Sequence, residues 1–108
     1  MPRALLLTDD AADDLDEIGG YIAQHDSPAR AAQVLDRIGQ AIADLADMPE
    51  RGAVPAELAA LGIHTYREVF FKPYRIVYRV LPDAVVVFLI ADGRRNMQAL
   101  LERRMLKP

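Results

Sequence analysis

The fold is decided by two neighbouring stretches, Tyr74-Arg75-Ile76-Val77-Tyr78-Arg79-Val80 and Ala84-Val85-Val86-Val87-Phe88-Leu89-Ile90-Ala91. The first is rich in aromatic and β-branched residues, which predicts a strand. The second contains six consecutive apolar residues from Val85 to Ile90, which is typical of a strand buried on both faces in the middle of a sheet. The sequence Leu81-Pro82-Asp83-Ala84 between them predicts a turn.

Further elements follow on either side of this pair. Residues 65–71 predict another strand, separated from the strand at 74–80 by a tight turn at Lys72-Pro73. After the closing Asp92-Gly93, a short final helix is predicted, with Arg103, Arg104 and Lys107 in its last turn. Its apolar stripe is Met97, Leu100, Leu101 and Met105. This stripe either completes the core or binds a partner.

The first half of the chain predicts a strand and a helical hairpin. An apolar run at 3–8 precedes a helix over Asp10–His25, and Ser27 with Pro28 starts a second helix that ends near Asp47 or Met48. Residues 55–61 predict loose helical turns closed by Gly62. The order is β-α-α-β-β-β-α. We therefore expect one α+β domain over residues 1–108, with the helical hairpin packed on a mainly antiparallel sheet.

Composition excludes several classes of chemistry. The chain has 108 residues, of which 52% are hydrophobic and 27% charged, and it contains no cysteine. Disulfides, thiolate nucleophiles and cysteine metal sites are therefore excluded. His25 and His64 lack a second ligand at metal-binding spacing, so no metal or cofactor is expected. No apolar run reaches the length of about 20 residues that a membrane helix needs, and the N-terminal run is too short for a signal peptide. We expect a cytoplasmic protein.

Charge is distributed unevenly along the chain. Up to Gly62, four basic residues stand against twelve acidic ones, a net charge of −8, whereas from Ile63 nine basic residues stand against four acidic ones, a net charge of +5. A basic half indicates a polyanionic or acidic partner, unless the two halves neutralise each other across the fold. The aspartates near the start of the first helix are explained by the helix dipole, although paired catalytic carboxylates are an alternative.

Several arginines belong to the predicted sheet. Alternation places Arg75, Val77 and Arg79 on the face of their strand that points away from the helical hairpin. Grouping Arg67 with them predicts a basic sheet face, rimmed by Lys72, Arg94 and Arg95, that could bind phosphates or an acidic peptide. Alternatively, these arginines pair with nearby acids such as Glu68, Asp83 and Asp92. No recognition-helix motif is evident, so sequence-specific DNA binding is not expected.

Over nearly its whole length the chain resembles the RelE/ParE superfamily of toxins from bacterial toxin–antitoxin systems. The resemblance rests on residues 66–80, on the apolar strand followed by Arg94-Arg95, on the first helix from Ala11 to Ile22, and on Pro49-Glu50-Arg51-Gly52. It implies the β-α-α-β-β-β-α fold, a cognate antitoxin as partner, and a toxin–antitoxin hetero-oligomer.

The superfamily divides by target. RelE-like members cut messenger RNA on the ribosome, and alignment with them places Arg67, Arg75 and Arg95 at basic positions of the nuclease. A strand lysine position holds Val69, and the position of a tyrosine in the last helix holds Leu101. Neither side chain can move a proton.

This departure favours the ParE-like branch, whose members inhibit DNA gyrase by binding, so we expect no catalytic residues. Candidate residues for binding the target or the antitoxin are Arg67, Lys72, Arg75, Arg79, Arg94, Arg95 and Leu101. The alternatives are a RelE-like mRNA endoribonuclease and an inert paralogue that only binds its antitoxin.

Overall fold

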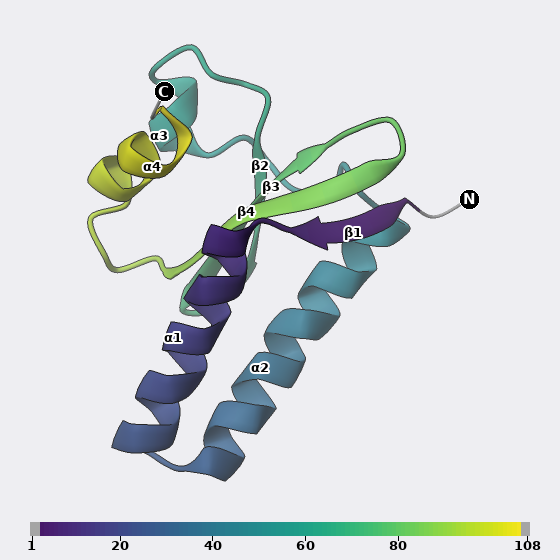
Figure 1. The fold of residues 1–108 in the computed structure, drawn as a ribbon. Coiled ribbons are helices and arrows are strands. Elements are labelled where there is room, and N and C mark those ends of the chain that lie inside the picture. Colours follow the sequence, from purple (N-terminus) through teal and green to yellow (C-terminus); the bar gives the residue numbers. More distant parts are fainter. Residues whose placement is uncertain (1–2, 107–108) are drawn as a thin grey trace.

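The first two helices form the predicted hairpin. In the computed structural model, which describes residues 3–106, α1 spans Asp9–His25 and α2 spans Pro28–Ala43. The Thr8 hydroxyl accepts a hydrogen bond from the Ala11 amide, and Ser27 caps α2 in the same way through the Arg30 amide. The second helix ends earlier than predicted, because its last turn, Asp44–Ala46, tightens into a 3₁₀ helix. Figure 1 shows the two helices side by side beneath the sheet.

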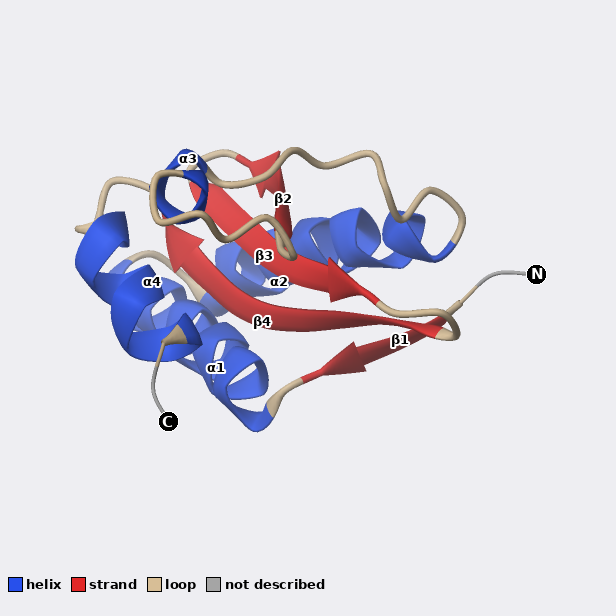
Figure 2. Cartoon of the chain, turned by 90° about the horizontal axis from the view of Figure 1, so that it is seen from above, coloured by secondary structure: helices blue, strands red, loops and turns tan. Residues whose placement is uncertain are grey.

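The sheet has four strands in the order β1-β4-β3-β2. They are β1 (Ala4–Leu7), β2 (Arg67–Phe71), β3 (Tyr74–Val80) and β4 (Ala84–Asp92). Strand β1 runs parallel to β4, and the other two pairings are antiparallel. The longest apolar run therefore lies between two neighbours, as predicted, and Figure 2 shows β1 and β2 at the two edges. Strand β2 begins two residues later than predicted, and β4 extends further at both ends.

The sheet is the middle of three layers. One face packs on the helical hairpin, through Ile76 and Tyr78 of β3 among others. The other face is covered at one end by the short helix α3 (Ala56–Ala59) and by α4 (Met97–Met105), as Figure 2 shows. There Leu58, Val77, Leu89, Ala91, Met97, Leu100 and Leu101 form a second buried cluster. The apolar stripe of the final helix therefore completes the core. Lys107, which was expected in the last turn of this helix, lies outside the described residues.

A bulge changes which residues of β4 face the hairpin. Val77 is opposite Leu89 and Tyr78 is opposite Val87, so Phe88 has no partner in β3. As a result Val87 and Ile90, three positions apart, both pack on the hairpin, while Leu89 packs under α4. Both faces of β4 are thereby filled with apolar side chains.

No helix within residues 3–106 combines the length and the apolar character required to cross a membrane.

The turn after α3 closes at Gly62, whose φ of 76° is a conformation that glycine adopts readily. This position agrees with the predicted helix end.

Candidate functional site

The predicted basic sheet face does not form, because Arg67 and Arg75 lie on opposite faces of the sheet. Arg67 is paired with Tyr78 and Phe70 with Arg75, and directly opposite residues share a face. Arg67 thus lies on the hairpin face, where its Nη1 donates to the Gly52 carbonyl at 2.6 Å and to the Glu50 carbonyl at 3.2 Å. The expectation that Arg67, Arg75 and Arg79 share one face is therefore wrong.

Arg75 is held inside a cluster of ionised side chains. Its Nη1 and Nη2 donate to the two carboxylate oxygens of Glu57 at 2.8 and 2.7 Å, and its Nε donates to Glu68 at 2.7 Å. The side chain of Arg75 is only 12% exposed, and that of Glu68 only 9%. Hydrogen bonds from Arg75 lower the pKa of Glu57, and those to Glu57 and Glu68 raise the pKa of Arg75.

This cluster ties α3 to the sheet and neutralises Arg75. Its guanidinium already has two carboxylate partners, so it is not available to bind a phosphate. The alternative interpretation, in which sheet arginines pair with neighbouring acids, is correct for Arg75 and Glu68. Glu57 was not anticipated as a partner, because it comes from a different element 18 residues away.

A second ion pair attaches α4 to α1. Arg104 donates through both Nη atoms to the carboxylate of Asp14, each at 3.0 Å, and also to the Phe88 carbonyl at 2.7 Å. Asp14 in turn accepts a hydrogen bond from the Ile90 amide at 2.9 Å. Strand β1 ends at Leu7, opposite Val87, so β1 provides no partners for the part of β4 beyond Val87. Asp14 and Arg104 instead provide the hydrogen-bond partners of the Ile90 amide and the Phe88 carbonyl. Asp14 is therefore structural and not part of a catalytic carboxylate pair.

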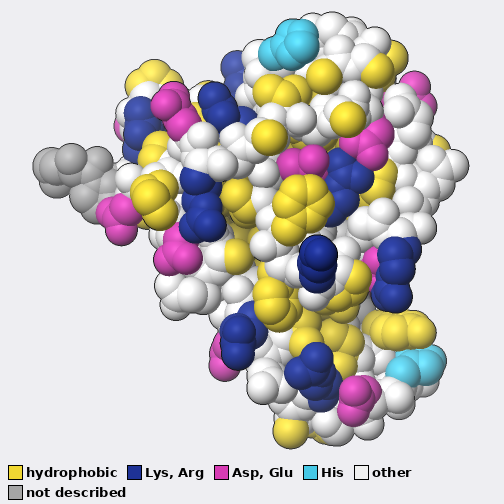
Figure 3. Space-filling model, turned by 180° about the vertical axis from the view of Figure 1, so that it is seen from behind, with side chains coloured by type: hydrophobic (Ala, Val, Ile, Leu, Met, Phe, Trp, Pro, Cys, Tyr) yellow, Lys and Arg dark blue, Asp and Glu magenta, His cyan; other side chains and the backbone are white. Residues whose placement is uncertain are grey.

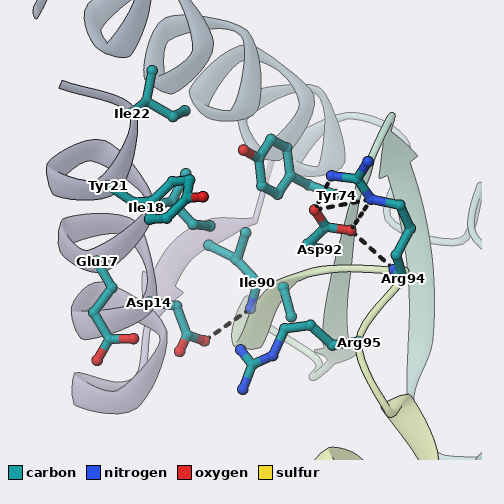
Figure 4. A pocket seen from close by; sticks show the side chains of 11 residues that line it. Asp14, Glu17, Ile18, Tyr21, Ile22, Tyr74, Ile90, Asp92, Arg94 and Arg95 are labelled. Carbon is teal, nitrogen blue, oxygen red and sulfur yellow. Dashed lines mark hydrogen bonds and ion pairs between the residues drawn. The ribbon is translucent and has the colours of Figure 1, made fainter. Parts of the chain in front are cut away.

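A groove of about 430 Å³ between α1 and the end of β4 is the candidate functional site. Its α1 side consists of Asp14, Glu17, Ile18, Tyr21 and Ile22, and its other side of Tyr74, Ile90, Ala91, Asp92, Arg94 and Arg95. Figure 4 shows Arg94 folded onto Asp92 beside Tyr74, with Arg95 on the other side of Ile90. Among residues 3–106 Arg95 has no carboxylate within ion-pair distance, so it is the unpaired cation of the groove.

The groove is suited to binding more than to proton transfer. Hydrogen bonds from Arg94 lower the pKa of Asp92, so this carboxylate stays ionised. Burial raises the pKa of Tyr74, which keeps its hydroxyl protonated at neutral pH. An apolar floor with charged side chains at its rim is typical of a surface that binds a protein segment. Within residues 3–106 no group of three potential metal ligands occurs.

The remaining predicted site residues do not line the groove. Leu101 is fully buried between α4 and the sheet face opposite the hairpin, so it cannot contact a partner while α4 stays in place. Arg79 and Lys72 are exposed. Arg79 is next to the last residue of β3, and Figure 2 shows that α3 and α4 leave this end of β3 uncovered. His25 and His64 are exposed, as expected for surface residues.

The groove was not predicted from the sequence, and Ile18 and Ile22, which line it, also pack against the hairpin core. The sequence contained one signal for the groove, because a large aromatic residue, Tyr21, lies between these two positions. In the structure its side chain is 64% exposed. An exposed aromatic residue beside an apolar stripe can mark a contact surface, although only the tertiary structure brings Tyr74 and Arg95 next to it.

The helical hairpin under a β1-β4-β3-β2 sheet is a fold shared with solved structures of ParE and RelE systems. A chain of the chromosomal ParDE toxin–antitoxin system from P. aeruginosa superimposes with a TM-score of 0.71. That match has 22% sequence identity and covers 83% of this chain and 95% of the other.

Sequence comparison places the chain more narrowly. The model of the ParE toxin of the type II toxin–antitoxin system parDE matches residues 5–97. Toxin ParE3 of Caulobacter vibrioides is 29% identical over 91 residues, covering 84% of this chain and 87% of that protein. The putative toxin Y4kP of Sinorhizobium fredii is 37% identical over 86 residues, covering 80% and 84% respectively. The chain belongs to the ParE toxin family of type II toxin–antitoxin systems.

Proposed function

We propose that this toxin inhibits DNA gyrase by binding to it in the cytoplasm, without cleaving nucleic acid, and that a cognate antitoxin neutralises it. Membership of the ParE family supports the assignment as a toxin. The choice of gyrase rests on the resemblance to ParE-like proteins. An antitoxin partner is supported by the similar fold in a ParDE toxin–antitoxin system.

The dispersal of the three arginines that a RelE-like nuclease would use is the observation that carries this proposal. Arg75 is engaged by Glu57 and Glu68, and Arg67 lies on the opposite face, where it donates to backbone carbonyls. Arg95 has no ion-pair partner among the described residues and lines the α1–β4 groove. RNA cleavage needs an acid and a base beside the scissile phosphate, together with a group that stabilises its charge. These side chains do not converge on one point.

The two positions that depart from the nuclease pattern support the same conclusion. Leu101 of α4 packs in the buried cluster between this helix and the sheet, and Val69 packs against the hairpin core. Both side chains are apolar and face inward, so neither leaves a proton-transfer group at the surface. A binding protein needs no such group, and the groove beside α1 offers it an apolar contact with the unpaired cation Arg95.

A titration of gyrase tests the proposal. Purified chain should inhibit supercoiling in a saturable way, at amounts comparable to the enzyme. Arg95→Glu should weaken inhibition, whereas the matched control Arg79→Glu, far from the groove, should not. Failure of the intact, folded chain to inhibit supercoiling would contradict the proposal and favour an inert antitoxin-binding paralogue.

The nuclease alternative has its own assay. When the chain is added to translating ribosomes, mapping of transcript ends should reveal no toxin-dependent cuts. Discrete cuts in the ribosomal A site, produced by trace amounts of chain, would instead establish a RelE-like endoribonuclease.

A further inference from the structure

The outer edge of β2 is open over its second half. Strand β2 is at the end of the sheet order, and outside the sheet Ala53 is the only residue within 3–106 that bridges to it, accepting a hydrogen bond from the Glu68 amide at 2.8 Å. In an antiparallel ladder alternate residues point their backbone groups outward, so the N–H and C=O of Phe70 point the same way as those of Glu68. No other element within residues 3–106 bridges to Phe70, and its side chain is 59% exposed.

Basic side chains flank this open edge on the hairpin side. Arg30 and Arg37 of α2 line a hollow of about 130 Å³ together with Gln33, Val34 and Phe71. Lys72, which follows β2, lines the adjoining hollow of about 320 Å³ with Arg30, and the acidic residue there is Asp26. In the described part of the chain no ion pair involves Arg30, Arg37 or Lys72. Figure 3, which views this side, shows hydrophobic side chains among Lys and Arg side chains in its lower half.

The other side of the edge has a different character. The side chain of Phe70 is on the face that carries Arg75, whose guanidinium lies 6.0 Å from the centre of the Phe70 ring. The charge of that guanidinium is met by Glu57 and Glu68, so the exposed feature here is an aromatic ring. Side chains of an added strand alternate between the two faces. Acidic residues would therefore meet α2, and apolar residues would meet Phe70.

We propose that this edge binds an extended segment of alternating acidic and apolar residues as an additional strand of the sheet. Backbone hydrogen bonds to Phe70 would fix the segment, and the alternation would select it. The bridge at Ala53 limits the contact to Val69–Lys72, so the charges on α2 contribute much of the affinity. The assignment of this segment to the antitoxin rests on the proposed function.

Two synthetic peptides test the site. Each has about eight residues, which is long enough to span the open edge. One alternates Glu and Val, and the other contains the same residues in Glu-Glu-Val-Val blocks. Titrated into the full ¹⁵N-labelled chain, the alternating peptide should bind at least about tenfold more tightly, a difference of about 1.4 kcal/mol. It should also slow exchange of the Phe70 amide hydrogen with solvent.

Three variants separate the contributions. Arg30→Glu with Arg37→Glu should weaken binding of the alternating peptide by about tenfold or more, and the matched pair Arg79→Glu with Arg103→Glu, exposed elsewhere, should not. Phe70→Pro removes the outward N–H but no hydrogen bond to β3, so it should abolish binding in a chain that still folds. Phe70→Ala retains the N–H and should keep the slowed amide exchange at position 70.

Equal affinity for the two peptides, insensitivity to the Arg30→Glu and Arg37→Glu changes, or perturbed amides confined to the α1–β4 groove would overturn the proposal. The assay contains neither gyrase nor antitoxin. A chain that binds the alternating peptide but leaves supercoiling unchanged therefore retains the edge site and loses the proposed function. Failure of the peptide to compete with the antitoxin encoded beside the toxin gene would overturn the assignment to the antitoxin.

Discussion

The two faces of the sheet are buried by different means. The hairpin face is covered by long helices along the whole of β3 and holds an apolar core that includes Ile38 and Ile76. The opposite face is covered only at one end, where a smaller apolar cluster is joined by the ion pairs of Arg75 with Glu57 and Glu68. Arg75 and Arg79 share that face, yet Arg75 is nearly buried and Arg79 is exposed. Whether α3 and α4 cover an arginine therefore decides its role more than the face of the sheet on which it lies.

Removal of α4 would break this comparison most severely. A chain that ends after Asn96 loses the buried side chains of Met97, Leu100 and Leu101, at about 2 kcal/mol each. A loss of about 6 kcal/mol is comparable to the whole stability of a small domain. We expect no cooperative thermal transition by circular dichroism. Gln98→Ala, an exposed change in the same helix, should melt like the original chain, and a cooperative transition in the truncated chain would exclude a core role for α4.

Removal of Arg75 is the next largest effect. Arg75→Ala leaves Glu57 and Glu68 facing each other in a mostly buried site, so we expect destabilisation by about 3 kcal/mol in urea unfolding. Arg79→Glu, on the same face but exposed, should change stability by about 0.5 kcal/mol or less.

A triple variant separates charge from packing at this site. Arg75→Met combined with Glu57→Gln and Glu68→Gln removes all three charges and keeps most of the volume. It should recover most of the lost stability, because no buried charge remains unpaired. A triple variant as unstable as Arg75→Ala would show that the geometry of the ion pairs matters more than their charge balance.

On the hairpin face, Tyr78 provides a smaller test. Its hydroxyl donates to the Pro49 carbonyl at 2.7 Å and accepts from the Gly52 amide at 3.0 Å, which fastens the loop after α2 to the sheet. Tyr78→Phe should cost about 1–3 kcal/mol in urea unfolding, because both groups of the loop lose their partner. Tyr66→Phe serves as the control, since its ring packs edge to face on Phe88. Equal stability of the Tyr78→Phe chain would mean that water replaces the hydroxyl.

Acid unfolding provides the mildest test of the ion pairs. The pKa of Glu57 is lowered by Arg75, so its stabilising contribution is complete above the usual carboxyl value of 4.5 and is lost as pH falls through its lower folded pKa. Stability measured below pH 4.5 should therefore fall less steeply in Glu57→Gln than in the original chain. Asp92 is shifted in the same direction by Arg94, but that pair is exposed, so added salt should reduce its contribution first. An identical slope in Glu57→Gln would contradict the role given to this pair.

Much of the fold follows from local sequence. The apolar spacing in α1 and α2, the caps at Thr8 and Ser27, and the continuous apolar run of β4 each depend on residues close together in the chain. The strand at 74–80 also has the predicted face toward the hairpin, because side chains in a strand alternate regardless of what covers them. The same residues carry the family resemblance, which the family model supports.

The error over Arg67 could have been avoided from sequence alone. A two-residue turn at Lys72-Pro73 pairs Phe71 with Tyr74, and counting outward from that pair places Arg67 opposite Tyr78. Odd-numbered residues of β2 therefore share a face with even-numbered residues of β3. This register puts Arg67 on the hairpin face, and Arg75 and Arg79 on the opposite face.

The sequence by itself determined the helices, the strands and the family, because these depend on periodicity, capping and motifs within short windows. Only the tertiary structure decided which charges are free. Glu57 reaches Arg75 across 18 positions and Asp14 reaches Arg104 across 90, and such pairings depend on how α3 and α4 pack. Within residues 3–106, the same packing leaves Arg95 beside the α1–β4 groove, and Arg30 and Arg37 beside the open edge of β2, without an ion-pair partner. Coulomb attraction acts through space, so the order of charges along the chain cannot show which of them remain for a partner.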